Sequence, residues 1–310
     1  MNLAYISHHD CQGHQMGAHH VEVPERLHAI NDRMIASGIE MLVTHYDAPM
    51  ATREHLLRVH DADYVDSIFK AAPAAADVLT WVDGDTAMCS GTLNAALRAA
   101  GAATLAVDLV MHDKHHAAFC AVRPPGHHAE RHAAMGFCFF NNVAVGAWHA
   151  MDSYGLERVA IIDFDVHHGN GTEDIVTGDE RILFGSSFQH PFYPGSGANS
   201  KAPNVMNIPL PARTDGAAFR AAVERNWLPR LEAFKPQLIM ISAGFDGHLE
   251  DDMANFNLRE ADYGWITKQL HDLAARHANA RIVSCLEGGY ALSALGRSVS
   301  THIDELIGRG

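Results

Sequence analysis

The sequence contains little cysteine. It has five cysteines among 310 residues, an odd number without a CxxC pair, so a disulfide framework is not expected. Cys120, Cys138 and Cys285 lie in apolar runs, which indicates reduced side chains in a core. We therefore expect a cytoplasmic protein.

Positive charge is also scarce. The chain has 23 Lys and Arg residues against 37 Asp and Glu residues, which gives a formal net charge of −14. An acidic chain is poorly suited to a nucleic-acid backbone, so we expect no nucleic-acid partner. The same charge favours cationic substrates.

Several kinds of segment are missing. The N-terminus has no basic start and only a short apolar run, so we expect no signal peptide. We find no apolar stretch of about 18 residues and expect no membrane span. Because no Ser/Pro-rich linker or internal repeat interrupts the chain, we predict one domain over residues 1–310.

Apolar strand-like runs alternate with helical patterns along the whole chain. This alternation predicts a parallel sheet covered on both faces, in a three-layer α/β/α domain. The predicted strands are 3–7, 117–122, 159–164, 181–188, 237–244 and 281–286. The predicted helices are 24–38, one or two within 52–70, 92–112, 142–155, one near 217–234, 262–280 and 291–308.

Polar clusters follow five of these strands. In open α/β sheets, ligands bind outside the carboxyl ends of the strands, so these clusters are expected to converge. They are RPPGHH (123–128), DVHHGN (165–170), SSFQH (186–190), GFDGH (244–248) and EGGY (287–290).

One run predicts a metal site. It places Asp165 and His167 two residues apart at the end of an apolar stretch, where both side chains can face one cation. Asp163 lies on the same face one step earlier, and three such groups are costly to bury without a metal or a hydrogen-bond network. The alternative is a buried Asp–His pair that only orders a loop.

Asp246 is the third predicted ligand, because it follows an apolar strand in the same way. Two carboxylates and one imidazole with an open position suit Zn²⁺ or Fe²⁺. Such a metal lowers the pKa of a bound water and polarises a carbonyl. The alternative for Asp246 is a helix cap or a turn residue.

His127 and His128 follow Pro-Pro-Gly and are candidates for a general base and its electrostatic partner. Each histidine needs an acceptor on its far nitrogen, and Asp163 and Asn170 are the expected acceptors. The alternative is a pair of surface histidines in a loop.

Tyr290 follows two glycines that permit close approach, and its hydroxyl can donate to the oxyanion of a tetrahedral intermediate. Phe137, Phe192 and Tyr193 are expected to form apolar walls, although such aromatics can equally belong to a core. Together these residues predict metal-assisted hydrolysis of an amide.

Nearly the whole chain resembles the histone deacetylase family, in particular its class II-like and bacterial members, which include acetylpolyamine amidohydrolases. The motifs that carry the resemblance are HHVEVPERL (19–27), RPPGHHAE (123–130), GFCFFNNVAVGA (136–147), DFDVHHGNGTEDI (163–175), SSFQHPFYPGSG (186–197), SAGFDGH (242–248) and LEGGY (286–290). Asn170 stands where class I members have Asp, which favours the class II-like branch.

The resemblance implies an arginase/deacetylase-type fold and a Zn²⁺ ion held by Asp165, His167 and Asp246. It implies His127 and His128 as the catalytic pair, Tyr290 as oxyanion donor, and Asp163 and Asn170 as partners of the histidines. A structural K⁺ ion would use Asp163, Asp165, His167, Ser186 and Ser187, partly through main-chain oxygens. A second K⁺ ion would use main-chain groups near Val176, Asp179, Ile182 and Asn204.

Three features bear on the substrate site. Met253 takes the place of a leucine that many relatives have in an Asp-Pro-Leu sequence, and no glutamate stands there to bind a second ammonium group. His20-Val21-Glu22 replaces the usual His-Pro-Glu near the entrance, which leaves the conformation of that loop open. Asp85 is the expected acceptor for the substrate backbone, with Asp83 as the alternative.

Two other classes of protein remain open. A binuclear ureohydrolase related to arginase would need further carboxylates, but Gly169 and His248 occupy those two places. A catalytically inactive acyl-lysine-binding module would have lost a histidine or the tyrosine, and this chain keeps them. The expected substrate is an acylated amine, either an acetyl-lysine peptide or an acetylpolyamine, and a homo-oligomer is possible.

Overall fold

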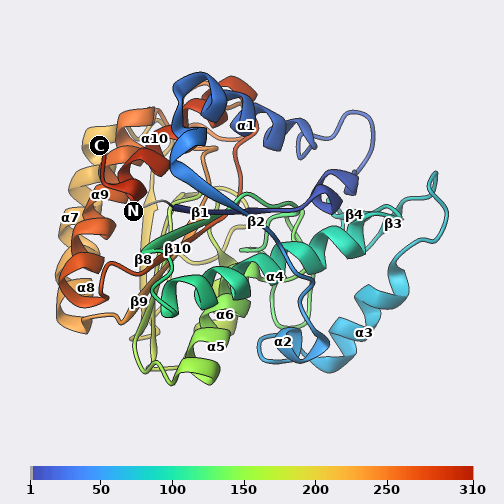
Figure 1. Ribbon diagram of the computed structural model, residues 1–310, viewed down its shortest axis with the longest axis horizontal. Helices are drawn as coiled ribbons and strands as arrows, with labels where there is room; N and C mark the ends of the chain where they lie inside the picture. The colour runs from blue at the N-terminus through green and yellow to red at the C-terminus, as the bar shows by residue number, and fades with distance from the viewer. Residues whose placement is uncertain (1–2, 310) are drawn as a thin grey trace.

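The computed structural model describes residues 3–309, and its centre is an eight-stranded sheet (Figure 1). The strand order is β2-β1-β5-β10-β9-β6-β7-β8, and every neighbouring pair is parallel. The strands are β1 (Leu3–Ser7), β2 (Val43–Asp47), β5 (Ala117–Cys120), β6 (Val159–Asp163), β7 (Ile182–Gln189), β8 (Val205–Leu210), β9 (Leu238–Ala243) and β10 (Ile282–Leu286). A separate antiparallel hairpin pairs β3 (Thr80–Trp81) with β4 (Ala87–Met88).

Helices form a layer on each face of the sheet (Figure 1). One layer contains α1 (Glu25–Ser37), α7 (Gly216–Asn226), α8 (Leu228–Phe234), α9 (Glu260–His277) and α10 (Leu292–Ile307). The other contains α4 (Thr92–Met111), α5 (Asn142–Tyr154) and α6 (Asn170–Val176), with α2 (Arg53–Leu57) packed against α5 and α3 (Ala62–Ala71) against α2. Two 3-10 helices, η1 (His9–Gly13) and η2 (Ile39–Leu42), complete the set. This arrangement confirms the predicted three-layer α/β/α class.

The central strands are apolar because both of their faces are covered. Every residue of β5, β6, β9 and β10 is buried, which explains why these strands were predicted from continuous apolar runs. The two edge strands, β2 and β8, lie outside the predicted strands. In β2 exposed residues alternate with more buried ones, and β8 contains the exposed Pro209. The predicted helix near 217–234 is two helices, α7 and α8, with Pro229 in the first turn of the second.

The expectation that the chain contains no apolar stretch of about 18 residues was wrong. Helix α4 is long and apolar enough by length and composition to cross a membrane, with a mean hydropathy of 1.3 over its best window. Within the molecule, 72% of that window is buried, and α4 packs against α5 and the strands β1, β5 and β10. Its alanines and Gly101 suit this position, since a Cβ at residue 101 would lie 1.9 Å from the Pro49 carbonyl oxygen.

The segment before α1 is held to the end of the sheet by a buried ion group. The Glu22 carboxylate accepts hydrogen bonds from Arg123 at 2.7 Å and from Arg26 at 3.0 Å, and all three side chains are fully buried. Arg123 also donates to the Cys11 carbonyl, and Arg26 donates to the Gly289 carbonyl at 2.6 Å. These contacts fix the conformation of the entrance loop that the His20-Val21-Glu22 sequence left open.

Substitution of Glu22 by Gln tests this ion group. Loss of the carboxylate leaves two buried guanidinium groups short of a counter-charge, so we expect a destabilisation of about 3 kcal/mol at pH 7, measured by urea unfolding. Although burial opposes ionisation, Arg123, His14 and Arg26 hold the pKa of Glu22 at about 2, below its unfolded value of 4.5.

The sign of the pH dependence follows from this depressed pKa. The Glu22 contribution is complete above about pH 4.5 and is lost as the pH falls towards 2. The difference in free energy of unfolding between wild type and Glu22→Gln should therefore shrink over that range. Glu25→Gln, at the exposed start of α1, is the control and should stay within 0.5 kcal/mol of wild type, roughly the usual surface effect. A constant difference from pH 7 to pH 3 would contradict the assignment.

Candidate active site

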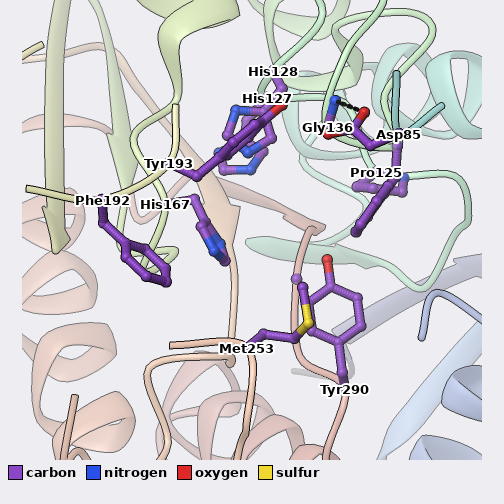
Figure 2. Close-up of a pocket in the computed structure, with 12 residues that line it drawn as sticks. Asp85, Pro125, His127, His128, Gly136, His167, Phe192, Tyr193, Met253 and Tyr290 are labelled. Carbon is purple, nitrogen blue, oxygen red and sulfur yellow. Dashed lines mark hydrogen bonds between the residues drawn. The ribbon is translucent and has the colours of Figure 1, made fainter. Parts of the chain in front are cut away.

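A pocket of about 220 Å³ opens at the carboxyl ends of the central strands (Figure 2). The segments that follow β5, β6, β7, β9 and β10 contribute to it, as the parallel sheet requires. Its lining residues are Asp85, Pro125, His127, His128, Gly136, Phe137, His167, Phe192, Tyr193, Met253, Gly288 and Tyr290.

Asp165, His167 and Asp246 meet at the base of this pocket. Nδ1 of His167 lies 3.2 Å from Oδ1 of Asp165 and 3.1 Å from Oδ2 of Asp246, and the three potential ligand atoms lie within 4.8 Å of one another. All three residues are buried. Strand β6 ends at Asp163, so the first two ligands stand on the bend that follows it rather than in the strand itself.

The charges of this group fit a metal ion. Burial and the charge of Asp165 raise the pKa of Asp246, while the two carboxylates raise the pKa of His167 above its ordinary value although burial opposes this. A single imidazole nitrogen faces two carboxylates and can donate only one proton between them. A cation bound by all three atoms would satisfy both carboxylates, and this donor set is one that Zn²⁺ accepts.

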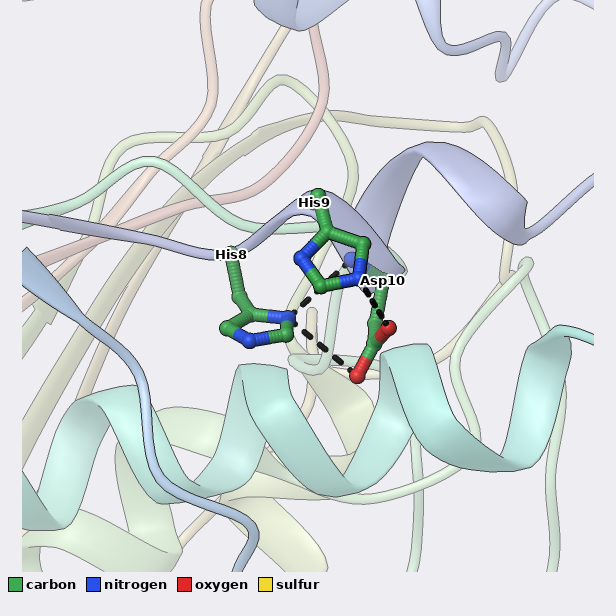
Figure 3. Close-up of side chains that lie close together, drawn as sticks. All are labelled: His8, His9 and Asp10. Atoms are coloured by element: carbon green, nitrogen blue, oxygen red, sulfur yellow. Dashed lines mark hydrogen bonds and ion pairs between the residues drawn. The ribbon is translucent and has the colours of Figure 1, made fainter.

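A second group of potential ligands, His8, His9 and Asp10, lies after β1 (Figure 3). Oδ2 of Asp10 is 3.2 Å from Nδ1 of His8, and its Oδ1 is 3.1 Å from Nε2 of His9. The same carboxylate accepts a hydrogen bond from Arg98 at 2.9 Å, so a protein cation already neutralises it. This group therefore differs from the buried one, whose carboxylates have only histidines as ion-pair partners among the described residues.

The structure disfavours a binuclear metal site at these residues. A Cβ at Gly169 would lie 2.2 Å from Oδ2 of Asp163, which leaves no room for a carboxylate there. His248 accepts a hydrogen bond from the backbone of Glu250 and pairs with Glu260 at 3.5 Å, away from the ligand group. The binuclear alternative therefore lacks its ligands in the folded chain.

His127 and His128 stand side by side in the pocket, with ring centroids 4.0 Å apart. Nδ1 of His127 lies 2.9 Å from Oδ2 of Asp163, and Nδ1 of His128 lies 2.7 Å from Oδ1 of Asn170. The Asn170 amide nitrogen donates to Glu130 at 2.7 Å, which fixes its oxygen towards His128. Both histidines are buried rather than surface residues, and Asp163 and Asn170 are their partners.

The different partners give the two rings opposite electrostatic properties. Burial alone would lower the pKa of His127, but Asp163 and Asp165 raise it to about 10. Burial, together with the neighbouring rings of His127 and His167, lowers the pKa of His128 well below its ordinary value. Asp163 and Asp165 therefore favour the protonated form of His127, whereas His128 favours the neutral form, in which Nδ1 donates to Asn170 and Nε2 carries the free lone pair.

Tyr290 projects its hydroxyl into the pocket (Figure 2). Burial raises the pKa of this hydroxyl well above its ordinary value, so it keeps its proton and remains a donor. The Arg26 guanidinium lies 4.9 Å from the centre of the tyrosine ring, and Phe137 meets the same ring edge-on with centroids 6.2 Å apart.

The residues predicted as walls all line the pocket. Phe192 stacks on His167 with centroids 5.6 Å apart, and Tyr193 meets His128 edge-on at 5.2 Å. Met253 lines the same pocket as Tyr290 (Figure 2). Of the two aspartates considered for the substrate backbone, Asp85 lines the pocket, where it accepts a hydrogen bond from the Gly136 N–H at 3.0 Å.

The segments predicted to bind K⁺ also lie together. Asp163 pairs in register with Ser186 across β6 and β7, and Ser186 and Ser187 are buried. At the second place, the Asn204 amide nitrogen donates to the carbonyls of Val176, Asp179 and Ile182 at 2.8, 3.2 and 3.2 Å. The carbonyl oxygens of Val176, Asp179 and Ile182 thus converge on the Asn204 amide group.

Sequence reasoning missed residues whose side chains bind the backbone of the catalytic segments. Glu287 accepts hydrogen bonds from the backbone N–H groups of Gly126 and His127 at 2.7 and 3.1 Å, and Ser242 donates to its other oxygen. Asp251 accepts hydrogen bonds from the backbone of Tyr290. The sequence shows Glu287 before the Gly288-Gly289-Tyr290 segment and Asp251 after Asp246. No local sequence pattern indicates which backbone groups these two carboxylates contact.

Comparisons with known proteins give matches over most of the chain. The family model "Histone deacetylase domain" matches residues 20–306. The chain is 36% identical to "Type-2 histone deacetylase 2" of Dictyostelium discoideum over 97% of its own length, but it spans only 20% of that protein. It is 36% identical to "Histone deacetylase-like amidohydrolase" of Pseudomonas aeruginosa, with 94% of this chain and 78% of that protein covered.

A solved structure is similar over almost the whole chain. The crystal structure of the HDA15 HD domain superposes with a TM-score of 0.91 and 30% sequence identity, covering 99% of this chain and 88% of that one. The predicted resemblance and fold are both confirmed by these matches. The chain belongs to the histone deacetylase family.

Proposed function

We propose that this chain is a zinc-dependent deacylase that hydrolyses the amide of an N-acetylated or other short-acyl amine such as acetyl-lysine. The family makes it a hydrolase of the deacetylase type. The observation that carries the finer proposal is the convergence of Asp165, His167 and Asp246 beside two histidines and a tyrosine in one pocket.

Zinc would be held by Asp165, His167 and Asp246, whose potential ligand atoms lie within 4.8 Å of one another. When bound, it would lower the pKa of a water molecule and polarise the amide carbonyl. For K⁺ we propose a structural role at the segments around Asp163 and Ser186 and around Asn204.

His128 is the proposed general base. Its Nδ1 donates to Asn170, so its Nε2 accepts the proton of the attacking water, and the low pKa keeps this nitrogen unprotonated beforehand. The same Nε2 then returns the proton to the leaving amine. His127, held protonated by Asp163, contributes a fixed positive charge beside the negative charge that develops on the carbonyl oxygen.

Tyr290 is the proposed oxyanion donor. Its hydroxyl faces the pocket and keeps its proton because burial raises its pKa. Phe137, Tyr193 and Met253 would exclude water around the acyl group and the aliphatic chain of the amine. The Asp85 carboxylate at the pocket wall would accept a hydrogen bond from the remainder of the substrate.

An activity assay tests the proposed deacylase function directly. Purified protein loaded with Zn²⁺ should hydrolyse a fluorogenic acetyl-lysine or trifluoroacetyl-lysine amide, and chelation should abolish the reaction. Comparison of kcat/KM for an acetyl-lysine peptide and N-acetylputrescine distinguishes a protein substrate from the alternative acetylpolyamine substrate. Failure to cleave any short acyl amide would leave the inactive binding module as the better account.

Replacement of Tyr290 by Phe tests the oxyanion role. Loss of one preorganised donor should lower kcat on the order of 10²- to 10³-fold, with zinc content unchanged. Tyr46→Phe makes the same chemical change at a tyrosine outside the pocket, bonded to His115, and should leave kcat within about twofold. Full activity of the Tyr290 variant would remove this residue from the mechanism.

Replacement of Asp246 by Ala tests the metal site. Removal of one of three ligands should weaken zinc binding by more than the roughly 10- to 100-fold loss expected when only an outer partner is removed. Elemental analysis after dialysis measures this directly and requires no activity. Asp252→Ala, at an exposed position in the same loop, is the control, and equal zinc content in both variants would place the third ligand elsewhere.

A further inference from the structure

Asp251 has a buried carboxylate that does not line the pocket but contacts the backbone of two pocket-lining residues, Met253 and Tyr290. Its Oδ2 accepts hydrogen bonds from the N–H groups of Tyr290 at 2.6 Å and Ala291 at 2.9 Å. Its Oδ1 accepts one from the N–H of Met253 at 3.1 Å. One side chain, 5% exposed, thus joins the loop that carries Asp246 and Met253 to the segment that carries Tyr290.

The tyrosine segment depends on such a contact. Tyr290 follows Gly288 and Gly289, and Gly289 has φ +124°, a conformation that residues with a side chain rarely adopt. Because glycine restrains its backbone little, other contacts must hold this conformation. Helix α10 begins at Leu292, and its N-cap residue, Ala291, offers no side-chain acceptor. The N–H groups at this helix start would therefore lack partners without Asp251.

A second anchor holds the same segment from its carbonyl side. Arg26 donates to the carbonyls of Gly289 and Glu287, so the turn has a fixed cation on one side and a fixed carboxylate on the other. Arg26 contacts the turn and the ring of Tyr290, whereas Asp251 is hydrogen-bonded to the backbone N–H of Tyr290 itself.

We propose that Asp251 is a positioning residue that sets the place of the Tyr290 hydroxyl relative to His127 and His128 and fixes it to the Met253 wall. Its effect on the reaction passes through Tyr290. This role rests on the proposed deacylase function wherever kcat is the readout. Backbone exchange provides a second readout that does not depend on activity.

The test compares Asp251→Asn with Asp252→Asn, which makes the same chemical change at the exposed neighbouring residue. Asp251→Asn should lower kcat about 10- to 100-fold, as expected for a misplaced catalytic group, while zinc content stays at the wild-type value. Asp252→Asn should leave kcat within about twofold. Hydrogen exchange at the amides of Tyr290 and Ala291 should accelerate in the first variant alone.

A double substitution separates positioning from a general structural effect. In the Tyr290→Phe background, Asp251→Asn should cost less than about twofold in kcat, because its effect acts through the missing hydroxyl. A full additional loss in that background would overturn the proposal, as would unchanged exchange at Tyr290 and Ala291. If wild type proves inactive while exchange still accelerates, the deacylase function fails and the anchoring role stands.

Asp251→Glu covers the case in which the asparagine variant does not fold. It keeps the carboxylate but moves it by one methylene, so kcat should again fall and the fall should again disappear beside Tyr290→Phe. Wild-type kcat in Asp251→Glu, with wild-type exchange at Tyr290, would overturn the proposal.

Discussion

The burial of three aspartates at one end of a parallel sheet is the constraint on which the site depends. Asp163, Asp165 and Asp246 are buried close to one another, and backbone N–H groups stabilise them: Asp165 donates to Asp163, His167 and Gly288 to Asp165, and Val166 to Asp246. The backbone can approach this closely because glycines stand beside the carboxylates. A Cβ at Gly244 would lie 1.9 Å from Oδ2 of Asp165, and one at Gly288 would lie 2.2 Å from Oδ2 of Asp246.

The buried carboxylates at Glu22 and at Asp165 and Asp246 differ in their partners among the described residues. Glu22 has two guanidinium partners at hydrogen-bond distance, so its charge is compensated by the protein and the group is closed. Asp165 and Asp246 accept hydrogen bonds from backbone N–H groups, but among the described residues their ion pairs are with histidines alone, so no permanently charged cation compensates these two buried carboxylates. The first group therefore stabilises the fold, and the second is suited to bind a cation from solution.

The sequence predicted the parts of the fold whose physical signal is local. Buried central strands appear as apolar runs, and the polar residues after them lie at the carboxyl ends by the rule of parallel sheets. Strands β2 and β8 were not predicted, because each contains exposed residues that interrupt an apolar run, and β8 carries a proline. The roles of Arg26 and Asp251 could not be predicted for another reason. Arg26 contacts the segment around Tyr290 from 263 residues away in sequence, and Asp251 contacts it from 39 residues away.

The proposed division of roles between the adjacent histidines His127 and His128 follows from one difference in their hydrogen-bond partners. Both rings are buried and nearly in contact, so desolvation acts on each and a proton on one disfavours a proton on the other. His127 faces a carboxylate, Asp163, and keeps the proton, whereas His128 faces a neutral amide, Asn170. A carboxylate at residue 170 would pull the pKa of His128 upwards and place both rings in competition for a charge. The amide, with its orientation fixed by Glu130, preserves the hydrogen bond that aligns His128 and leaves its other nitrogen free to accept a proton.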